Sequence, residues 1–293
     1  MELQTSGNFQ TIYTGLLGRQ LSNRLQSRVL NGLYKRSDLN YFYEVLDVDT
    51  NDIPSIVDAL KTMDFKGFNV TIPGKSLMAY LSDELSPDAA YTKSVNTVLI
   101  KDGRLIGYNT EGTGFLKALI RSGFKPKGSV ITILGCGNAA RAVMVRCALA
   151  GFSKINVLIR PESPNRRQSE RTADIMEAST NCRINFYDIN DEKTLKYLAD
   201  ESDVLLNATP VGEGSDHPES LIQDPSVFRP DLTVADMVAV PAATKLLLDA
   251  KEAGCRCISG LDMLLYQSSG SFRIWTGQAV READLLSLYP LLY

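Results

Sequence analysis

The sequence predicts an α/β protein in which apolar strands and helices alternate along almost all of its 293 residues. Short apolar runs of strand length are separated by amphipathic or polar segments of helix length, an order typical of mostly parallel sheets. Hydrophobic residues make up 44% of the chain and charged residues 22%, as in ordinary globular proteins. At roughly 150 residues per domain, this length corresponds to about two domains.

The first predicted unit ends in a β-hairpin. Strands are expected at 11–18, 41–48 and 68–72, and helices at 24–34 and 52–63. Two further apolar runs, 95–100 and 104–108, flank the turn sequence Lys101-Asp102-Gly103 and predict an antiparallel pair. The first unit is therefore expected to be an α/β layer closed by a hairpin.

The second predicted unit begins after Pro126-Lys127-Gly128, with an uninterrupted apolar strand at 129–134 of the kind found where both faces of a sheet are covered. Further strands are expected at 154–159, 183–187, 204–207 and 233–238, and helices at 138–150, 168–179 and 192–199. The polar run 161–171 is interpreted as a solvated loop that leads into a helix. Two helices, 261–275 and 282–289, are expected to close the chain.

Charge and hydropathy exclude several classes of partner. The chain has 31 Lys and Arg against 34 Asp and Glu, which gives a net charge of −3. It therefore lacks the excess of basic residues that a nucleic-acid partner requires. No apolar run reaches the roughly 18 residues of a membrane helix, and the first residues lack a secretory signal. We therefore expect a small-molecule substrate and no nucleic-acid or membrane partner.

Histidine and cysteine usage narrows the chemistry. His217 is the only histidine in the sequence and lies in a polar, loop-like stretch, so a Ser-His-Asp triad or a histidine-rich metal site would depend on this one residue. Acid–base chemistry is therefore expected from Lys, Asp, Glu, Tyr or Cys, and no metal is expected. The odd number of cysteines, five, fits a disulfide framework poorly and favours a reducing cytoplasm, with a redox role left open.

A glycine turn connects the strand at 129–134 to the following helix. The sequence Gly135-Cys136-Gly137-Asn138-Ala139-Ala140 allows a tight turn, a close approach of backbone to a pyrophosphate, and close packing of helix on strand. The N–H groups of the helix N-terminus would face the phosphates. This arrangement is typical of a Rossmann dinucleotide-binding domain, although a glycine turn without a ligand has the same local pattern.

The end of the next strand is expected to select between the two nicotinamide dinucleotides. Arg160 favours the 2′-phosphate of NADP, with Arg166 and Arg167 shortly after it. Glu162 keeps NAD possible, because a carboxylate there accepts from the ribose 2′-hydroxyl. The arginines also suit a solvated loop.

Upstream of the glycine turn, three polar segments follow apolar strands and are expected to meet beyond the strand ends. They are Gly67-Phe68-Asn69-Val70-Thr71-Ile72-Pro73-Gly74-Lys75, Ser94-Val95-Asn96-Thr97 and Gly107-Tyr108-Asn109-Thr110-Glu111. Lys75 can move a proton, Glu111 can hold its ammonium in position, and Asn96 offers a donor and an acceptor to a hydroxylated ligand. Taken singly, each of these residues is better explained as a surface charge or a turn former.

Together these segments resemble the shikimate dehydrogenase family over nearly the whole chain. The resemblance also includes the motifs at 134–140, 207–212 (NATPVG) and 260–267 (GLDMLLYQ). It implies a substrate domain at 1–110 and 260–293, facing a Rossmann domain at 111–259 across a cleft. The implied reaction is reversible hydride transfer between NADPH and 3-dehydroshikimate, giving shikimate.

The resemblance also assigns roles to individual residues. It implies Lys75 and Glu111 as the catalytic pair, and Arg24, Gln26, Thr71, Asn96 and Gln267 as substrate contacts. It implies that the cofactor lies against Gly135, Gly137, Asn138, Ala139, Arg160, Thr209, Val238 and Gly260.

The sequence departs from the family pattern in four ways. Glu111 stands where the family has Asp, and the extra methylene moves the carboxylate by roughly an ångström. Arg24 and Gln26 replace two serines that grip the substrate carboxylate, and Asn23 replaces a nearby histidine. Arg24 either binds a carboxylate bidentately or points to solvent. The remaining departures are Ala239 in place of a tyrosine and Asn138 at a position that is often glycine.

These departures favour the divergent shikimate dehydrogenase-like branch of the family. The function they indicate is NAD(P)-dependent hydride transfer with shikimate, quinate or a related carboxylated, hydroxylated ring. The alternative is a non-catalytic NADP(H)-binding protein of the same fold that senses redox state or binds a partner. A monomer or a homodimer is equally compatible with the sequence.

Overall fold

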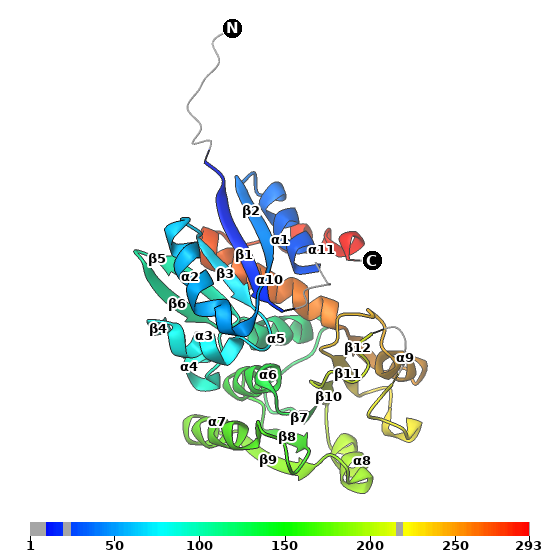
Figure 1. Cartoon of the computed structure of the whole chain (residues 1–293). Helices are drawn as coiled ribbons and strands as arrows, with labels where there is room; N and C mark the ends of the chain where they lie inside the picture. Colours follow the sequence, from blue (N-terminus) through cyan, green and yellow to red (C-terminus); the bar gives the residue numbers. More distant parts are fainter. Residues whose placement is uncertain (1–9, 20–24, 215–218, 293) are drawn as a thin grey trace.

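The computed structural model describes residues 10–19, 25–214 and 219–292. Asn23, Arg24 and His217 lie outside the described residues. Strands and helices alternate in two six-stranded sheets, which confirms the α/β prediction (Figure 1).

The first sheet has the strand order β2-β1-β3-β5-β6-β4. Its strands are β1 (Ile12–Gly18), β2 (Tyr41–Asp47), β3 (Gly67–Val70), β4 (Glu84–Leu85), β5 (Thr97–Lys101) and β6 (Arg104–Tyr108). β1 pairs in parallel with β2 and β3, whereas β5 runs antiparallel to β3 and to β6. The hairpin is present as expected, and it makes this sheet mixed.

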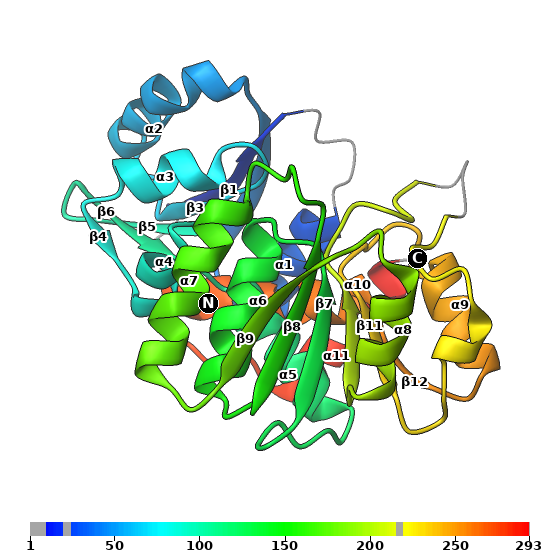
Figure 2. The same cartoon turned by 90° about the horizontal axis from the view of Figure 1, so that it is seen from below.

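The second sheet is parallel throughout and has the order β12-β11-β10-β7-β8-β9 (Figure 2). Its strands are β7 (Val130–Leu134), β8 (Lys154–Ile159), β9 (Arg183–Asp188), β10 (Val204–Asn207), β11 (Thr233–Asp236) and β12 (Arg256–Ile258). The chain order reverses between β7 and β10. In open parallel sheets, ligands bind beyond the strand C-termini at such a reversal.

Helices cover both faces of each sheet. The first sheet packs against α1 (Leu25–Arg36) and α10 (Gly260–Thr276) on one face, and against α2 (Ile53–Thr62) and α3 (Lys75–Leu81) on the other. The second sheet packs against α5 (Glu111–Arg121), α6 (Asn138–Leu149) and α7 (Arg166–Ser179) on one face, and against α8 (Glu192–Asp200) and α9 (Lys245–Glu252) on the other. The short helices α4 (Pro87–Thr92) and α11 (Glu282–Leu286) pack on α6 and α10, respectively.

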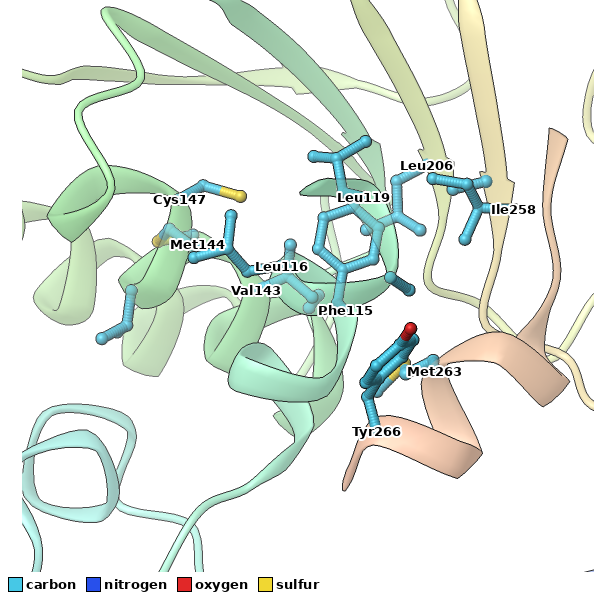
Figure 3. Close-up of a cluster of buried hydrophobic side chains, with 14 of the residues drawn as sticks. Phe115, Leu116, Leu119, Val143, Met144, Cys147, Leu206, Ile258, Met263 and Tyr266 are labelled. Atoms are coloured by element: carbon cyan, nitrogen blue, oxygen red, sulfur yellow. The ribbon is translucent and has the colours of Figure 1, made fainter. Parts of the chain in front are cut away.

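Helix α5 lies between α6 and α10 and joins the cores of the two sheets. Figure 3 shows its Phe115 and Leu119 among side chains of α6, of α10 and of the second sheet. A Cβ on Gly112 would lie 2.0 Å from the Ala142 carbonyl oxygen of α6, and one on Gly114 would lie 2.8 Å from the Gln267 nitrogen of α10. Only glycine fits at such separations, so the backbone of α5 packs tightly against both helices.

Several elements differ from the sequence-based expectation. Helices α3, α4, α5 and α9 were not predicted; α3 and α4 are short, and Gly112 and Gly114 weaken the helical pattern of α5. The expected strand at 68–72 ends at Val70, and the expected helix at 282–289 ends at Leu286. A 3-10 turn at Tyr289–Leu291 follows; Pro290 has no N–H to donate to the Leu286 carbonyl, so the α-helical hydrogen bonds do not continue past it.

Candidate active site

A buried ion pair joins the first sheet to helix α5. The Lys75 Nζ donates to the Glu111 Oε1 at 2.5 Å, and each side chain is only 9% exposed. Lys75 begins α3 directly after the turn that leaves β3, and Glu111 begins α5. A carboxylate at a helix N-terminus is favoured by the helix dipole. The sequence prediction that these two residues meet is therefore consistent with their geometry.

Asparagine side chains fix the position of Glu111. The Asn109 Oδ1 accepts from the Glu111 N–H at 3.1 Å, and the Asn109 Nδ2 donates to the Ser94 carbonyl at 3.1 Å. The Asn96 Oδ1 accepts from the Thr110 N–H at 2.8 Å, and its Nδ2 donates to the Thr110 Oγ1 at 2.9 Å. Asn96, predicted to contact substrate, therefore already uses both ends of its amide to hold the turn before Glu111.

Asn69 is the hub of a second polar cluster, and sequence reasoning did not single it out as a site residue. Its Oδ1 accepts from the Gln26 Nε2 and from the Tyr43 hydroxyl, both at 2.8 Å. Its Nδ2 lies 2.9 Å from the Thr97 Oγ1 and 3.0 Å from the Ser271 Oγ. Gln26, at one of the substituted serine positions, is thus anchored to the buried sheet. The sequence feature that could have identified Asn69 is that it is an asparagine inside an otherwise apolar strand.

Two other predicted substrate contacts, Thr71 and Gln267, lie on segments that adjoin the ion pair, the turn before Lys75 and the helix packed on α5. Thr71 is partly buried at the turn that follows β3, and its N–H donates to the Leu17 carbonyl at 3.0 Å. Gln267 lies on α10, with its backbone against Gly114 of α5. The Gln267 Oε1 and the Glu111 Oε2 are buried and have no hydrogen-bond partner among the described residues. Buried acceptors of this kind suit a ligand that supplies hydroxyl donors.

A cavity of about 440 Å³ lies beyond the C-terminal ends of the second sheet. Six predicted cofactor residues line it: Gly135, Gly137, Asn138, Ala139, Arg160 and Thr209. Lys75 lines it as well, so the lysine of the buried ion pair reaches the same space, whereas Glu111 does not line it. Lys75 is therefore the point at which the two candidate clusters of the sequence meet.

The glycine turn has the shape that a dinucleotide requires. Gly135 has a φ of +104°, and a Cβ there would lie 2.9 Å from the Thr209 Cγ2. A Cβ on Gly137 would instead meet open space, which leaves room for a pyrophosphate. Helix α6 begins at Asn138, and no side chain caps its N-terminus. Its first N–H groups therefore suit phosphate oxygens, and the residues present fit a nicotinamide dinucleotide.

Arg160 and Thr209, which follow the ends of β8 and β10, flank this cavity. The Arg160 Nε lies 4.0 Å from the Glu162 Oε1, and both side chains are mostly exposed, so the contact between them is weak. Thr209 is held by Asn207, whose Oδ1 accepts from the Thr209 Oγ1 at 2.7 Å. Arg160 is thus free to turn toward a ligand, whereas Thr209 has a fixed orientation.

Val238 and Gly260 do not line this cavity. They lie against each other, since a Cβ on Gly260 would lie 2.3 Å from the Val238 carbonyl oxygen. The Val238 N–H donates to the Asp236 Oδ1 at 3.0 Å. That carboxylate also accepts from Asn207 and Thr244, and burial raises its pKa. Asp236, not predicted as a site residue, thus connects the segment after β11 to the network that holds Thr209.

Other chemistries find little support in the described part of the chain. All five cysteines are free, and burial raises the pKa of the Cys182 thiol to about 11. Among the described residues, no group of three His, Cys, Asp or Glu side chains is placed to hold a metal ion. No helix within the described ranges has both the length and the apolar character needed to cross a membrane.

Comparisons with known proteins identify the family. Residues 16–98 match the family model described as the shikimate dehydrogenase substrate binding domain. The chain is 37% identical over 279 residues to a shikimate dehydrogenase (NADP(+)) of Alkaliphilus metalliredigens, covering 95% of each chain. The solved structure of shikimate 5-dehydrogenase from Listeria monocytogenes, with shikimate and NAD, has a TM-score of 0.89 at 31% identity. It covers 100% of this chain and 99% of that one.

A solved structure whose printed activity is different also matches. The ligand-free 5-ketofructose reductase of Gluconobacter sp. strain CHM43 has a TM-score of 0.84 at 27% identity, and it covers 97% of this chain and 100% of that one. The likeness to the Alkaliphilus enzyme, at 37% identity over 95% of the chain, decides the assignment. The chain belongs to the shikimate dehydrogenase family.

Proposed function

We propose that the chain is an NAD(P)-dependent oxidoreductase that interconverts 3-dehydroshikimate and shikimate, or a related carboxylated, hydroxylated ring, by reversible hydride transfer. The observation that carries this proposal is the buried Lys75–Glu111 pair, with its 2.5 Å contact, whose lysine lines the cavity at the glycine turn. The names of the Alkaliphilus and Listeria relatives support the same reaction.

Lys75 is the proton-transfer group in this proposal. In the reducing direction, its ammonium donates a proton to the substrate oxygen as negative charge develops there, and in the other direction the neutral amine accepts that proton. The nicotinamide ring of a bound dinucleotide supplies or accepts the hydride. Proton transfer by a positioned side chain contributes typically 10²- to 10⁴-fold to a rate.

Glu111 keeps the lysine in place through that cycle. Its Oε1 holds the Lys75 ammonium, while Asn109 fixes the backbone from which the carboxylate extends. Its buried Oε2 and the Gln267 Oε1 remain as acceptors for hydroxyls of the substrate. Because the site is buried, these contacts are stronger than they would be in water.

NADP is the cofactor we propose, with NAD as the second choice. Arg160 is an exposed cation at the rim of the cavity, suited to a 2′-phosphate, and Glu162 follows it closely. The Alkaliphilus relative is named for NADP(+), and the Listeria structure holds NAD. Both cofactors therefore belong in the test.

The proposal extends to the organisation of the protein. We assign residues 1–110 and 260–293 to a substrate domain and residues 111–259 to a dinucleotide domain, because α10 packs on α1 of the first sheet. A cytoplasmic location is proposed on the five free cysteines, which suit a reducing compartment. A monomer or a homodimer is proposed for the assembly.

The experiment follows NADP+ and NAD+ reduction by a panel of substrates: shikimate, quinate, aminoshikimate and simple hydroxy acids. A neutral polyol belongs in the panel, because a 5-ketofructose reductase has a similar structure. Turnover with shikimate or quinate supports the proposal. Turnover with the polyol alone would remove the carboxylated ring from it.

A non-catalytic dinucleotide-binding protein is the second candidate. Ala239, which replaces a family tyrosine, and Gln26, which is tied to Asn69, favour it because both change the substrate side. The buried Lys75–Glu111 pair opposes it, since binding a dinucleotide does not require that pair. Tight NADPH binding with no oxidation of any compound in the panel would select this candidate.

A further inference from the structure

Arg141 is an almost fully buried arginine whose role the proposed reaction does not explain. It lies on α6 and is 2% exposed. Among the described residues its guanidinium forms no ion pair; it donates instead from the Nε to the Thr92 carbonyl at 3.3 Å and from the Nη1 to the Cys136 carbonyl at 3.4 Å. Its Nη2 donates to the Asn138 Oδ1. A buried cation held by carbonyls and one amide is costly, so its position needs a reason.

The partners of Arg141 belong to two different parts of the site. Cys136 and Asn138 are members of the glycine turn that lines the dinucleotide cavity. Thr92 ends α4, which precedes the strands of the β5–β6 hairpin. Arg141 therefore bonds the cofactor turn directly to the part of the chain that carries the substrate side.

From Thr92 the hydrogen bonds continue to the catalytic pair. The Thr92 Oγ1 donates to the Ser94 carbonyl at 3.2 Å, and the Asn109 Nδ2 donates to the same carbonyl at 3.1 Å. Asn109 in turn accepts from the Glu111 N–H at 3.1 Å. An unbroken set of contacts thus leads from the glycine turn through Arg141 to Glu111.

Charge supports the same connection. Burial lowers the pKa of Arg141, and the charge of the Glu111 carboxylate acts in the opposite direction. The Glu111 carboxylate thus stabilises two buried cations, Lys75 by contact and Arg141 through space. Arg141 is linked to Glu111 both by hydrogen bonds and by electrostatics.

Arg146 offers a matched comparison on the same helix. Its Nη1 lies 3.3 Å from the Asp88 Oδ1, so it also ties α6 to α4, and its side chain is 32% exposed. It does not line the dinucleotide cavity. A role that is only packing of α6 on α4 would be shared by both arginines.

We propose that Arg141 is a positioning residue that couples occupation of the dinucleotide cavity to the geometry of the Lys75–Glu111 pair. A ligand that holds the glycine turn also fixes the guanidinium, and the guanidinium fixes Thr92 and the turn that carries Glu111. The proposal rests on the proposed function, in that the glycine turn binds a dinucleotide.

The test compares the full-length wild-type chain with Arg141→Met, Arg141→Lys and Arg146→Met. Three quantities are measured for each protein. NADPH affinity is measured by fluorescence, and kcat is measured at saturating NADP+ and shikimate. Amide hydrogen exchange at Thr110 and Glu111 is measured with and without NADPH. These two amides donate to the Asn96 and Asn109 side chains, so their exchange reports the turn directly.

In the wild type and in Arg146→Met, we expect NADPH to slow exchange at both amides at least fivefold. Arg141→Met should lose that effect and at least tenfold in kcat, whereas its NADPH affinity should change less than kcat. Arg141→Lys keeps the positive charge but loses the several N–H donors of the guanidinium. Its kcat and its NADPH-dependent protection should therefore lie between those of the wild type and of Arg141→Met. If Arg141→Met does not fold, the intermediate result of Arg141→Lys still carries the test.

Two outcomes would overturn the inference in different ways. Wild-type protein that fails to bind NADPH refutes the proposed function and the coupling with it. Wild-type protein that binds NADPH, with Arg141 variants that keep the protection at Thr110 and Glu111 or that match Arg146→Met in every readout, refutes the coupling alone.

Discussion

The proposed cofactor side and the proposed substrate side of the site are built in different ways. On the proposed cofactor side, the key groups are consecutive, from Gly135 to Ala139, and the backbone would supply most of the contacts. On the substrate side, they come from separate segments and depend on side chains such as Lys75, Glu111 and Gln267. A backbone site tolerates changes of side chain, whereas a side-chain site changes its ligand when a few residues change. The departures at Gln26 and Glu111 fall on the proposed substrate side and fit this difference, whereas Asn138 falls on the glycine turn.

Among the variants that test this comparison, removal of the Glu111 charge should lower kcat the most. Glu111→Gln leaves Lys75 buried without a carboxylate, and we expect kcat to fall by about 10²-fold or more. Glu111→Asp keeps the charge but shortens the reach, so a loss of about tenfold is expected. Steady-state kinetics of both variants gives the ranking.

Glu84→Gln is the control for that pair. Glu84 forms an exposed ion pair with Arg104 at 2.8 Å, and its loss should change kcat less than twofold. Equal losses in Glu84→Gln and Glu111→Gln would show that the buried carboxylate has no special role.

The two glycines of the turn should separate folding from cofactor binding. Gly135→Ala introduces a Cβ at positive φ, 2.9 Å from Thr209, and should destabilise the fold by about 1–2 kcal/mol. Gly137→Ala has an ordinary φ and open space around its Cβ, so we expect unchanged thermal stability and NADPH binding weaker by about tenfold, or about 1.4 kcal/mol. Thermal melts and NADPH titrations distinguish the two, and a Gly137→Ala variant with full NADPH affinity would contradict a pyrophosphate at this turn.

A smaller effect is expected at Arg160. Arg160→Ala should lower the ratio of kcat/KM for NADP+ to that for NAD+ by about tenfold, because a cation beside the 2′-phosphate is lost. Glu162→Ala should move the same ratio the other way. Kinetics with both cofactors checks this, and an unchanged ratio in Arg160→Ala would assign that arginine to solvent.

The smallest effect concerns stability and pH at Asp236. Burial raises its pKa, so ionisation is less favourable in the folded state than in the unfolded chain. The contribution of Asp236 to the free energy of unfolding is therefore most favourable at low pH. It is lost as the pH rises from about 4, the ordinary carboxyl pKa, through the raised pKa of the folded state. Asp236→Asn keeps an acceptor for Val238 and a donor for Thr244, and we expect it to flatten this part of the stability profile. Thermal melts of the wild type and of Asp236→Asn between pH 4 and pH 7 test this expectation. Identical dependence of stability on pH in the two proteins would contradict the predicted loss of stability with rising pH.

Local sequence patterns predicted the geometry of the glycine turn better than the scaffold around Lys75 and Glu111. The glycine turn is readable because strand, turn and helix follow one another within a few residues. Lys75 and Glu111 were predicted as a pair from motifs 36 positions apart, which their contact matches. Asn69, Asp236 and Arg141 were not predicted as site residues, because their partners come from distant segments that only the folded chain brings together.

Helix α5 illustrates the same limit. Its two inner glycines reduce helix propensity, yet they are what allows its backbone to approach α6 and α10. The contacts that require glycine at these two positions are made with other helices, so they cannot be read from the local sequence. The position of Glu111 at its first turn therefore follows from packing and not from a local helical signal.

The central claim is that Lys75 transfers the proton while other residues hold the dinucleotide. Its most direct test measures NADP+ reduction by shikimate and NADPH binding in Lys75→Ala, beside Lys101→Ala, an exposed lysine of the hairpin. We expect turnover of Lys75→Ala to fall by about 10²- to 10⁴-fold with NADPH affinity within threefold of wild type, and Lys101→Ala to match wild type in both. Turnover of Lys75→Ala equal to that of Lys101→Ala would contradict the claim.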